Sequence, residues 1–192
     1  MRIGSNNSLT YLEPSSWWLK IFNKFKRHQR KDYQFQYFYC AVRYFDIRVS
    51  ADIKGRIIVN NGCDFPMYEV LEFLNRYGDV TVRLTLDERL DDHMYGASDS
   101  LENKFKNTCK IAEAIYNGIN FVGGYRIYDK KQIYKFNGED INIIDLDKES
   151  FFYSIVTRLF PFMRKRLNKK YIDKFKYDDI VLLLNYVDYK AG

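Results

Sequence analysis

Val42-Arg43-Tyr44-Phe45-Asp46-Ile47-Arg48-Val49 is a run rich in β-branched and aromatic residues. Such a composition is typical of a β-strand. Asp46 and Arg48 stand two positions apart, so both side chains point to the same face of the strand and can form an ion pair. By itself the octapeptide therefore predicts one strand that carries a charged pair on one face.

Strands and helices alternate in the prediction for the rest of the chain. We expect a single α/β domain of mainly parallel strands over residues 1–192, because no internal repeat or linker interrupts the alternation. The last helix should break or kink at Pro161, and the polar residues 87–100 should form a loop. Strands are predicted at 2–4, 42–49, 56–60, 79–86, twice within 125–136, and at 179–187, and helices at 17–31, 66–77, 101–117 and 149–167.

Composition limits the class of protein. Hydrophobic residues make up 46% of the chain and charged residues 29%, which is typical of a globular protein and excludes a disordered one. The net charge of +6 favours anionic partners such as phosphate esters, anionic lipid or nucleic acid. Cys40, Cys63 and Cys109 show no C-x-x-C spacing and predict reduced thiols. Residues 1–5 contain no apolar h-region, so we predict no signal peptide and a cytoplasmic location.

Three further motifs accompany the octapeptide: Gly4-Ser5-Asn6-Asn7-Ser8, Val59-Asn60-Asn61-Gly62 and Leu184-Asn185-Tyr186-Val187. Each alone predicts only a turn or a strand end. In this order, and across nearly the whole chain, the four motifs resemble the bacterial type of the phosphatidylinositol-specific phospholipase C (X-domain-like) phosphodiesterases. That family carries G-T-H-D-S, then V-R-x-F-D-I-R, then a strand that ends in H-G. The resemblance implies a compact, irregular TIM-type (β/α) barrel with its active site at the carboxyl ends of the strands.

The resemblance also assigns catalytic positions. Asn6 and Asn61 stand where the family has its general base and general acid histidines, whereas Asp46 and Arg48 are retained. In bacterial relatives this arginine neutralises the phosphate. An asparagine amide can hydrogen-bond a phosphate, but it cannot transfer protons near neutral pH as imidazole does. We therefore expect a catalytically impaired phosphodiesterase domain that binds a phosphorylated or lipid head group, in the manner of a phosphoinositide.

Four further positions are expected to line the pocket: Asn7, Arg83, Asp87 and Asn185. Arg48 occupies the place where eukaryotic relatives need an acidic calcium ligand, so we expect no metal, and no other cofactor. Two alternatives stay open. One is a divergent, active phosphodiesterase that uses Asp46 or Asp87 for proton transfer. The other is a scaffold whose pocket is vestigial and whose basic helix recruits a membrane or a protein.

Residues 17–31 predict an amphipathic helix that is rich in lysine and arginine and lacks acidic residues. Bacterial relatives place a membrane-contacting helix here, and paired Trp beside Lys and Arg suits an anionic membrane surface. The alternative is a helix packed on the barrel with its basic face in water. A second basic cluster spans 164–176. Neither cluster accompanies a nucleic-acid-binding motif, and we expect a monomer that is peripheral at the membrane. The expected membrane contacts are Trp17, Trp18, Lys20, Phe22, Lys24 and Phe25.

Overall fold

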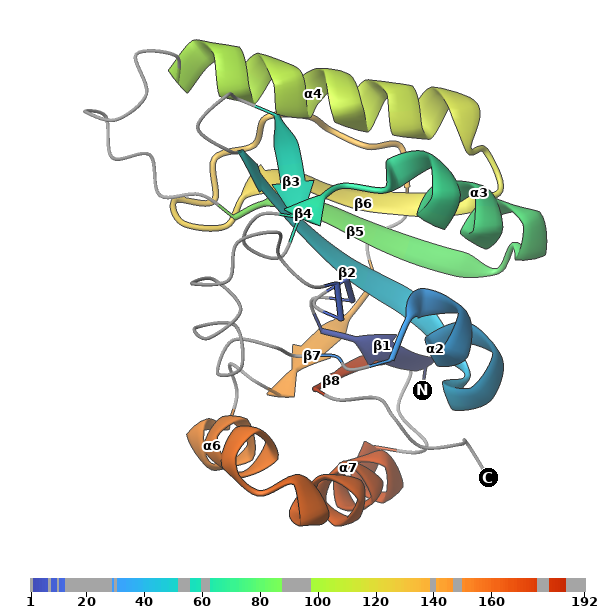
Figure 1. The fold of residues 1–192 in the computed structure, drawn as a ribbon, viewed down its shortest axis with the longest axis vertical. Coiled ribbons are helices and arrows are strands. Elements are labelled where there is room, and N and C mark those ends of the chain that lie inside the picture. The colour runs from blue at the N-terminus through green and yellow to red at the C-terminus, as the bar shows by residue number, and fades with distance from the viewer. Residues whose placement is uncertain are drawn as a thin grey trace.

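The computed structural model describes residues 2–6, 8–9, 11–12, 29, 31–51, 56–59, 63–87, 98–138, 141–146, 150–175 and 180–185. Six strands run parallel in one curled sheet (Figure 1). Two short strands extend the sheet beside the end of β2: β3 (Ile57–Val59) pairs antiparallel with β2, and β4 (Cys63–Asp64) pairs antiparallel with β3. The parallel order is β6 (Ile119–Arg126), β5 (Val80–Leu86), β2 (Val42–Ala51), β1 (Arg2–Ser5), β8 (Val181–Leu184) and β7 (Ile143–Asp145).

This sheet is a half-barrel. Within the described residues β6 and β7 are its two edges, and they do not pair with each other. The predicted α/β class with a parallel sheet is confirmed, but the described strands do not close into a barrel. Closure usually takes eight strands of matched length, and here the edge strand β7 has only three residues.

Five helices of the described chain accompany the sheet. The predicted helices at 66–77 and 101–117 correspond to α3 (Met67–Tyr77) and α4 (Ser98–Ile115). The predicted break at Pro161 is confirmed, because α6 (Phe151–Leu159) ends before it and α7 (Pro161–Phe175) begins there. The helix α2 (Tyr33–Cys40) was not predicted; the Asp32 side chain caps it by accepting from Phe35 N at 2.7 Å. The predicted helix at 17–31 lies outside the described residues except for positions 29 and 31.

Two predictions for the strands were wrong. The expected pair of short strands within 125–136 is absent from these described residues, because β6 already begins at Ile119 and ends at Arg126. Only an isolated bridge between Tyr125 and Gln132 follows. The strands β4 and β7 were missed, since two or three residues are too few to give a periodic pattern.

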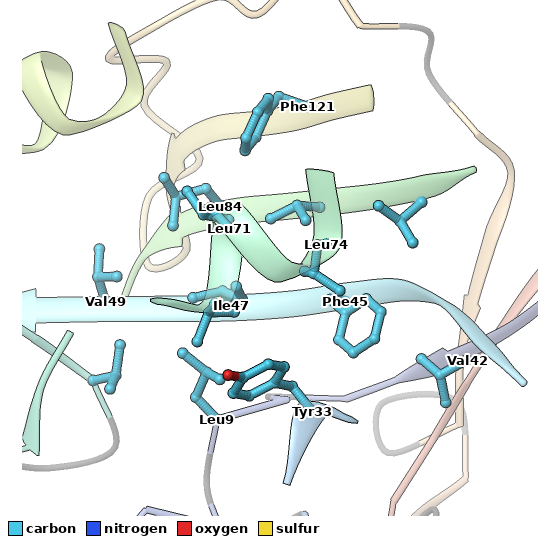
Figure 2. Packing of buried hydrophobic residues seen from close by; sticks show 14 of the residues in the cluster. Leu9, Tyr33, Val42, Phe45, Ile47, Val49, Leu71, Leu74, Leu84 and Phe121 are labelled. Carbon is cyan, nitrogen blue, oxygen red and sulfur yellow. The ribbon is translucent and has the colours of Figure 1, made fainter. Parts of the chain in front are cut away.

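The main hydrophobic core lies between the convex face of the sheet and the helices, with α2, α3 and α4 on one side and Tyr153 and Val156 of α6 and Leu167 of α7 on the other (Figures 1 and 2). Phe45, Ile47 and Val49 of β2 all belong to it. Successive strand residues point to opposite faces, so the residues between them face the concave side. A second, smaller apolar cluster, around Tyr44 and Leu183, fills the middle of that concave side. The concave side becomes polar towards the carboxyl ends of the strands, and this change places the candidate site there.

Candidate functional site

Polar side chains from five strands meet at the carboxyl ends of the half-barrel. They come from neighbouring strands in the sheet order β5, β2, β1, β8 and β7. Leu84 and Leu86 belong to the outer core, so the side chains between and beside them face inward with the polar residues of β2. The residues concerned are Asn6, Asp46, Arg48, Arg83, Thr85, Asp145 and Asn185.

Asp46 is at the centre of this group and is fully buried. Arg48 Nε donates to its Oδ2 at 2.9 Å, and Arg83 Nε donates to its Oδ1 at 2.8 Å. Burial alone would raise the pKa of Asp46, but the charges of the two arginines and their hydrogen bonds outweigh burial and lower the pKa well below its ordinary value. The same pairing raises the pKa of both guanidinium groups against the opposing effect of burial. Asp46 is therefore ionised at neutral pH.

Asn6, also fully buried, connects Asp46 and its arginines to the other side of the sheet. Arg48 Nη2 donates to Asn6 Oδ1 at 2.6 Å. Asn6 Nδ2 donates to Asn185 Oδ1 at 3.1 Å and to Asp145 Oδ1 at 3.4 Å. Since a guanidinium can only donate, the atom of Asn6 that faces Arg48 must be the oxygen, which fixes the orientation of this amide.

The backbone around Asn6 is held from two directions. Asn6 N donates to Leu184 O at 3.1 Å, which joins the end of β1 to the end of β8. Gln29 Nε2 donates to Asn6 O at 3.0 Å and to Leu184 O at 2.9 Å. Asn6 therefore sits on a rigid support, as a residue that orients a ligand requires.

Asn185 is held by α6 and α7. Its backbone N donates to Tyr153 Oη at 3.0 Å, and Tyr153 Oη donates in turn to Asn168 Oδ1 at 2.7 Å. Asn168 Nδ2 donates back to Asn185 O at 3.1 Å. Because all three residues are buried, this hydrogen-bonded loop fixes the two helices against the end of β8.

Several hydrogen-bond donors of the site are not used within the described part of the chain. Arg83 pairs with Asp46 through Nε, and neither of its Nη atoms has an acceptor among the described residues. The same holds for Arg48 Nη1, because Nε and Nη2 make this residue's contacts with Asp46, Asn6 and Asp145. The buried Thr85 hydroxyl also has no hydrogen-bond partner in the described chain. Unsatisfied donors that gather at one place indicate a site for an acceptor from outside.

The structure brings five of the predicted site residues together: Asn6, Asp46, Arg48, Arg83 and Asn185. It does not include Asp87, whose side chain is exposed just beyond β5 and whose backbone N donates to Val49 O at 2.7 Å. The remaining predictions lie outside the described residues: Asn7, Asn61 and the membrane contacts Trp17, Trp18, Lys20, Phe22, Lys24 and Phe25.

Sequence reasoning missed five contributors, among them Asn168, which holds the backbone of Asn185. Asp145 carries the clearest signal, because it follows the apolar pair Ile143-Ile144 as Asp46 follows Phe45. Thr85 belongs to the predicted strand at 79–86, and its inward direction follows from alternation with Leu84 and Leu86. Gln29 and Tyr153 gave no signal, because each acts through a backbone group of a distant strand end.

A cavity of about 470 Å³ lies at the opposite end of the sheet, where β5, β6 and β8 begin. Its half-buried Asn120 donates from Nδ2 to the buried Thr81 Oγ1 at 3.2 Å, so these two polar groups already satisfy each other. The carboxyl ends of the strands, with their unused donors, are therefore the better candidate site. Open α/β sheets generally bind ligands at that end.

The chemistry available at the carboxyl ends is binding by permanent charge. Arg48 and Asp145 contact the amide of Asn6, and Asp46 links Arg48 to Arg83. In the described chain no group of three or more His, Cys, Asp or Glu is arranged to hold a metal ion, and no described helix is long and apolar enough to cross a membrane. Neither a protein-family model nor a curated protein matches the chain.

Proposed function

We propose that this chain is a phospholipase C-like phosphodiesterase domain, of the irregular TIM-type barrel class, whose site binds a phosphorylated or lipid head group without hydrolysing it. One observation carries the proposal. Arg83, Arg48 and Thr85 present donors that lack acceptors in the described chain, at the carboxyl ends of a parallel half-barrel. The sequence motifs that resemble the phosphodiesterase family also support the proposal, because their residues Asn6, Asp46, Arg48 and Asn185 meet at this place.

A phosphate group suits these donors. Guanidinium groups bind phosphate oxygens in pairs and with fixed geometry. Asp46 holds both arginines before any ligand arrives, so little side-chain entropy is lost on binding. The formal charges of Arg48 and Arg83 balance those of Asp46 and Asp145. A bound phosphodiester monoanion therefore adds one uncompensated negative charge and a phosphomonoester dianion adds two, so the phosphodiester fits better.

The same residues argue against turnover. General acid–base catalysis needs a group whose pKa lies near the working pH. Asp46 is kept ionised by its arginines, and the amides of Asn6 and Asn185 do not titrate in this range. An active phosphodiesterase is the second candidate, and one observation favours it: the carboxylate oxygen Asp145 Oδ1 lies 3.4 Å from Asn6 Nδ2.

Binding is tested by titration calorimetry with glycerophosphoinositol, a phosphodiester, and inositol 1-phosphate, a phosphomonoester. We expect the diester to bind more tightly. Replacing Arg83→Gln should weaken binding by about 10- to 100-fold, the usual worth of a charged hydrogen bond. Arg76→Gln is the matched control, because Arg76 is exposed on α3 and pairs only with Glu72 in the described chain.

A variant that keeps the fold completes this test. Thr85→Val preserves shape and removes a buried hydroxyl that lacks a described partner, so it should leave stability unchanged or higher while binding weakens. Equal affinity in wild type, Arg83→Gln and Thr85→Val would rule out the proposed binding site.

Turnover is tested with phosphatidylinositol micelles. Wild type should release no cyclic inositol phosphate, whereas the Asn6→His/Asn61→His/Asn185→Asp variant restores the family's proton-transfer groups and should gain activity. Release of product by wild type, abolished in Asp145→Asn, would establish the second candidate instead.

A further inference from the structure

Helices α6 and α7 leave an unusual amount of apolar surface exposed. Phe162 is 79% exposed, Phe152 61% and Leu159 57%. Ile155 and Phe160 are exposed beside them. Phe152, Ile155 and Leu159 follow one another at i, i+3 and i+7, so they line one face of α6. Large apolar side chains gathered at one place on a surface generally mark an interaction site.

The exposed face of α7 adjoins this patch where the rings of Phe160 and Phe162 lie 6.0 Å apart, and it carries positive charge. Lys165, Arg166 and Lys169 follow Phe162 at i+3, i+4 and i+7, so they share its face of the helix, and all three are exposed. Within α7 the only acidic residue is Asp173. An apolar face bordered by lysine and arginine is the pattern of an element that lies in a membrane interface.

A second group of exposed aromatic side chains lies on α2 and serves as a comparison. Phe38 and Tyr39 on α2 are each about half exposed, but the residues of α2 carry no charge. Their rings also pack against neighbours, Phe38 against Phe73 and Tyr77, and Tyr39 against Phe35. The helix α2 itself therefore lacks the basic residues found on α7, and the cations beside it, Lys31 and Arg43, lie over the rings of Phe35 and Tyr37.

The α6–α7 surface is joined directly to the candidate site. Tyr153 of α6 and Asn168 of α7 bind the backbone of Asn185 from the buried side of the two helices. Figure 1 shows α6 and α7 beside the β7–β8 side of the sheet, away from α3 and α4. A partner bound to their exposed faces would thus lie at a fixed position relative to the strand ends.

We propose that the exposed α6–α7 surface docks on an anionic lipid bilayer. The apolar side chains Phe152, Ile155, Leu159, Phe160 and Phe162 enter the boundary between head groups and acyl chains, and Lys165, Arg166 and Lys169 contact anionic head groups. A second copy of the chain is a poorer occupant, because a two-fold interface would bring together two copies of the same basic face, and α7 carries only Asp173 to offset their repulsion. The proposal does not rest on the ligand assigned to the strand ends.

Co-sedimentation with vesicles tests the docking surface. Wild type should bind vesicles of phosphatidylcholine with phosphatidylserine, and bind pure phosphatidylcholine at least about tenfold more weakly, since each basic residue near the surface adds to the attraction. Phe152→Ser/Phe162→Ser and, separately, Lys165→Glu/Lys169→Glu should each weaken binding about tenfold or more. Phe38→Ser/Tyr39→Ser is the matched control and should bind as wild type does.

Two outcomes would overturn the docking proposal. One is that wild type does not bind anionic vesicles. This outcome includes the case in which sedimentation velocity shows a dimer formed through the α6–α7 surface. The other is equal loss of binding in the α2 control. The affinity of Phe152→Ser/Phe162→Ser for soluble glycerophosphoinositol separates the two proposals. This affinity should equal that of wild type. If wild type does not bind glycerophosphoinositol, the vesicle measurements still test the docking surface.

Discussion

Asp46 holds two arginines with a single buried carboxylate. Each oxygen accepts one Nε–H, at 2.9 Å from Arg48 and at 2.8 Å from Arg83. Removing charges from water is costly, and a buried ion pair repays that cost only when its geometry and hydrogen bonds are good. Here both conditions are met, and the unused Nη atoms remain available for a ligand. The pairing thus positions the arginines at the same time as it stabilises the fold.

Replacing Asp46→Asn should lower the free energy of unfolding by about 3–5 kcal/mol near neutral pH, because it leaves two largely buried guanidinium groups without their counter-ion. The pKa of Asp46 is lower in the folded than in the unfolded chain. Its stabilising contribution is therefore present above the unfolded pKa of about 3.9 and is lost as the pH falls below it. Urea unfolding between about pH 7 and pH 3 measures both effects.

The control for Asp46 is Asp173→Asn, which removes an exposed carboxylate from α7. This variant should keep the wild-type free energy of unfolding near neutral pH, because substitution of an exposed side chain usually changes stability little. The curve of stability against pH for Asp46→Asn should be flatter than that of wild type in the acid range. Parallel curves for wild type and Asp46→Asn would show that the carboxylate is not ionised in the way its contacts indicate.

At the scale of elements, β6 depends on a glycine in a conformation that other residues rarely adopt. Gly123 has φ of +99°, at the place where the register between β5 and β6 shifts. A Cβ on Gly123 would come 2.5 Å from Leu84 O and 3.2 Å from Arg83 Cγ. The glycine therefore lets β6 bend and leaves space for the Arg83 side chain on the concave face.

Gly123→Ala should destabilise the protein by about 3 kcal/mol, from unfavourable backbone conformation together with overpacking. Gly78→Ala is the matched control. Gly78 also has a positive φ, of +64° at the end of α3, but a Cβ there would meet nothing within 4 Å. Its ψ of −169° also favours glycine, so the control should cost about 1–2 kcal/mol from backbone conformation alone, less than Gly123→Ala. Thermal and urea unfolding of the two variants measure the difference, and equal losses would contradict the steric argument.

The elements that could be predicted from the sequence are those with local signals. The strand at 42–49 and the helix at 66–77 follow from side-chain periodicity, and the break at Pro161 follows from the missing N–H. The start of β6 could not be predicted, because Gly123 and Gly124 indicate an interruption, whereas pairing with β5 keeps the strand intact. For the site, strand-end motifs identified Asn6 and Asn185, but Asp145 depends on a strand of three residues.

At the scale of the molecule, the site depends on pairing between the first and last strands. In the described chain β1 lies between β2 and β8, with Ser5 opposite Leu184. This register is what brings Asn6 and Asn185, far apart in sequence, within 3.1 Å. Motif order in the sequence indicated that these ends should meet. It could not indicate the open side between β6 and β7, because strand pairing across a sheet is set by contacts distant in the chain.

Gly4 allows β1 to pack between its neighbours. A Cβ on Gly4 would come 2.5 Å from Leu183 Cδ2 and 3.0 Å from Val181 Cγ1, on the concave face. Gly4→Ala should therefore cost about 1–3 kcal/mol through overpacking. Leu183→Val removes the Cδ atoms, so Gly4→Ala should cost less in that background, with a coupling energy of about 0.5–3 kcal/mol by urea unfolding.

Leu182→Val is the control for this cycle, because Leu182 is buried on the same strand but belongs to the outer core. Gly4→Ala should cost as much in the Leu182→Val background as in wild type. If both leucine substitutions reduced the cost of Gly4→Ala equally, the strain would not lie between Gly4 and Leu183. If only Leu183→Val reduces this cost, the first and last strands meet on the concave face, and this contact places Asn6 against Asn185.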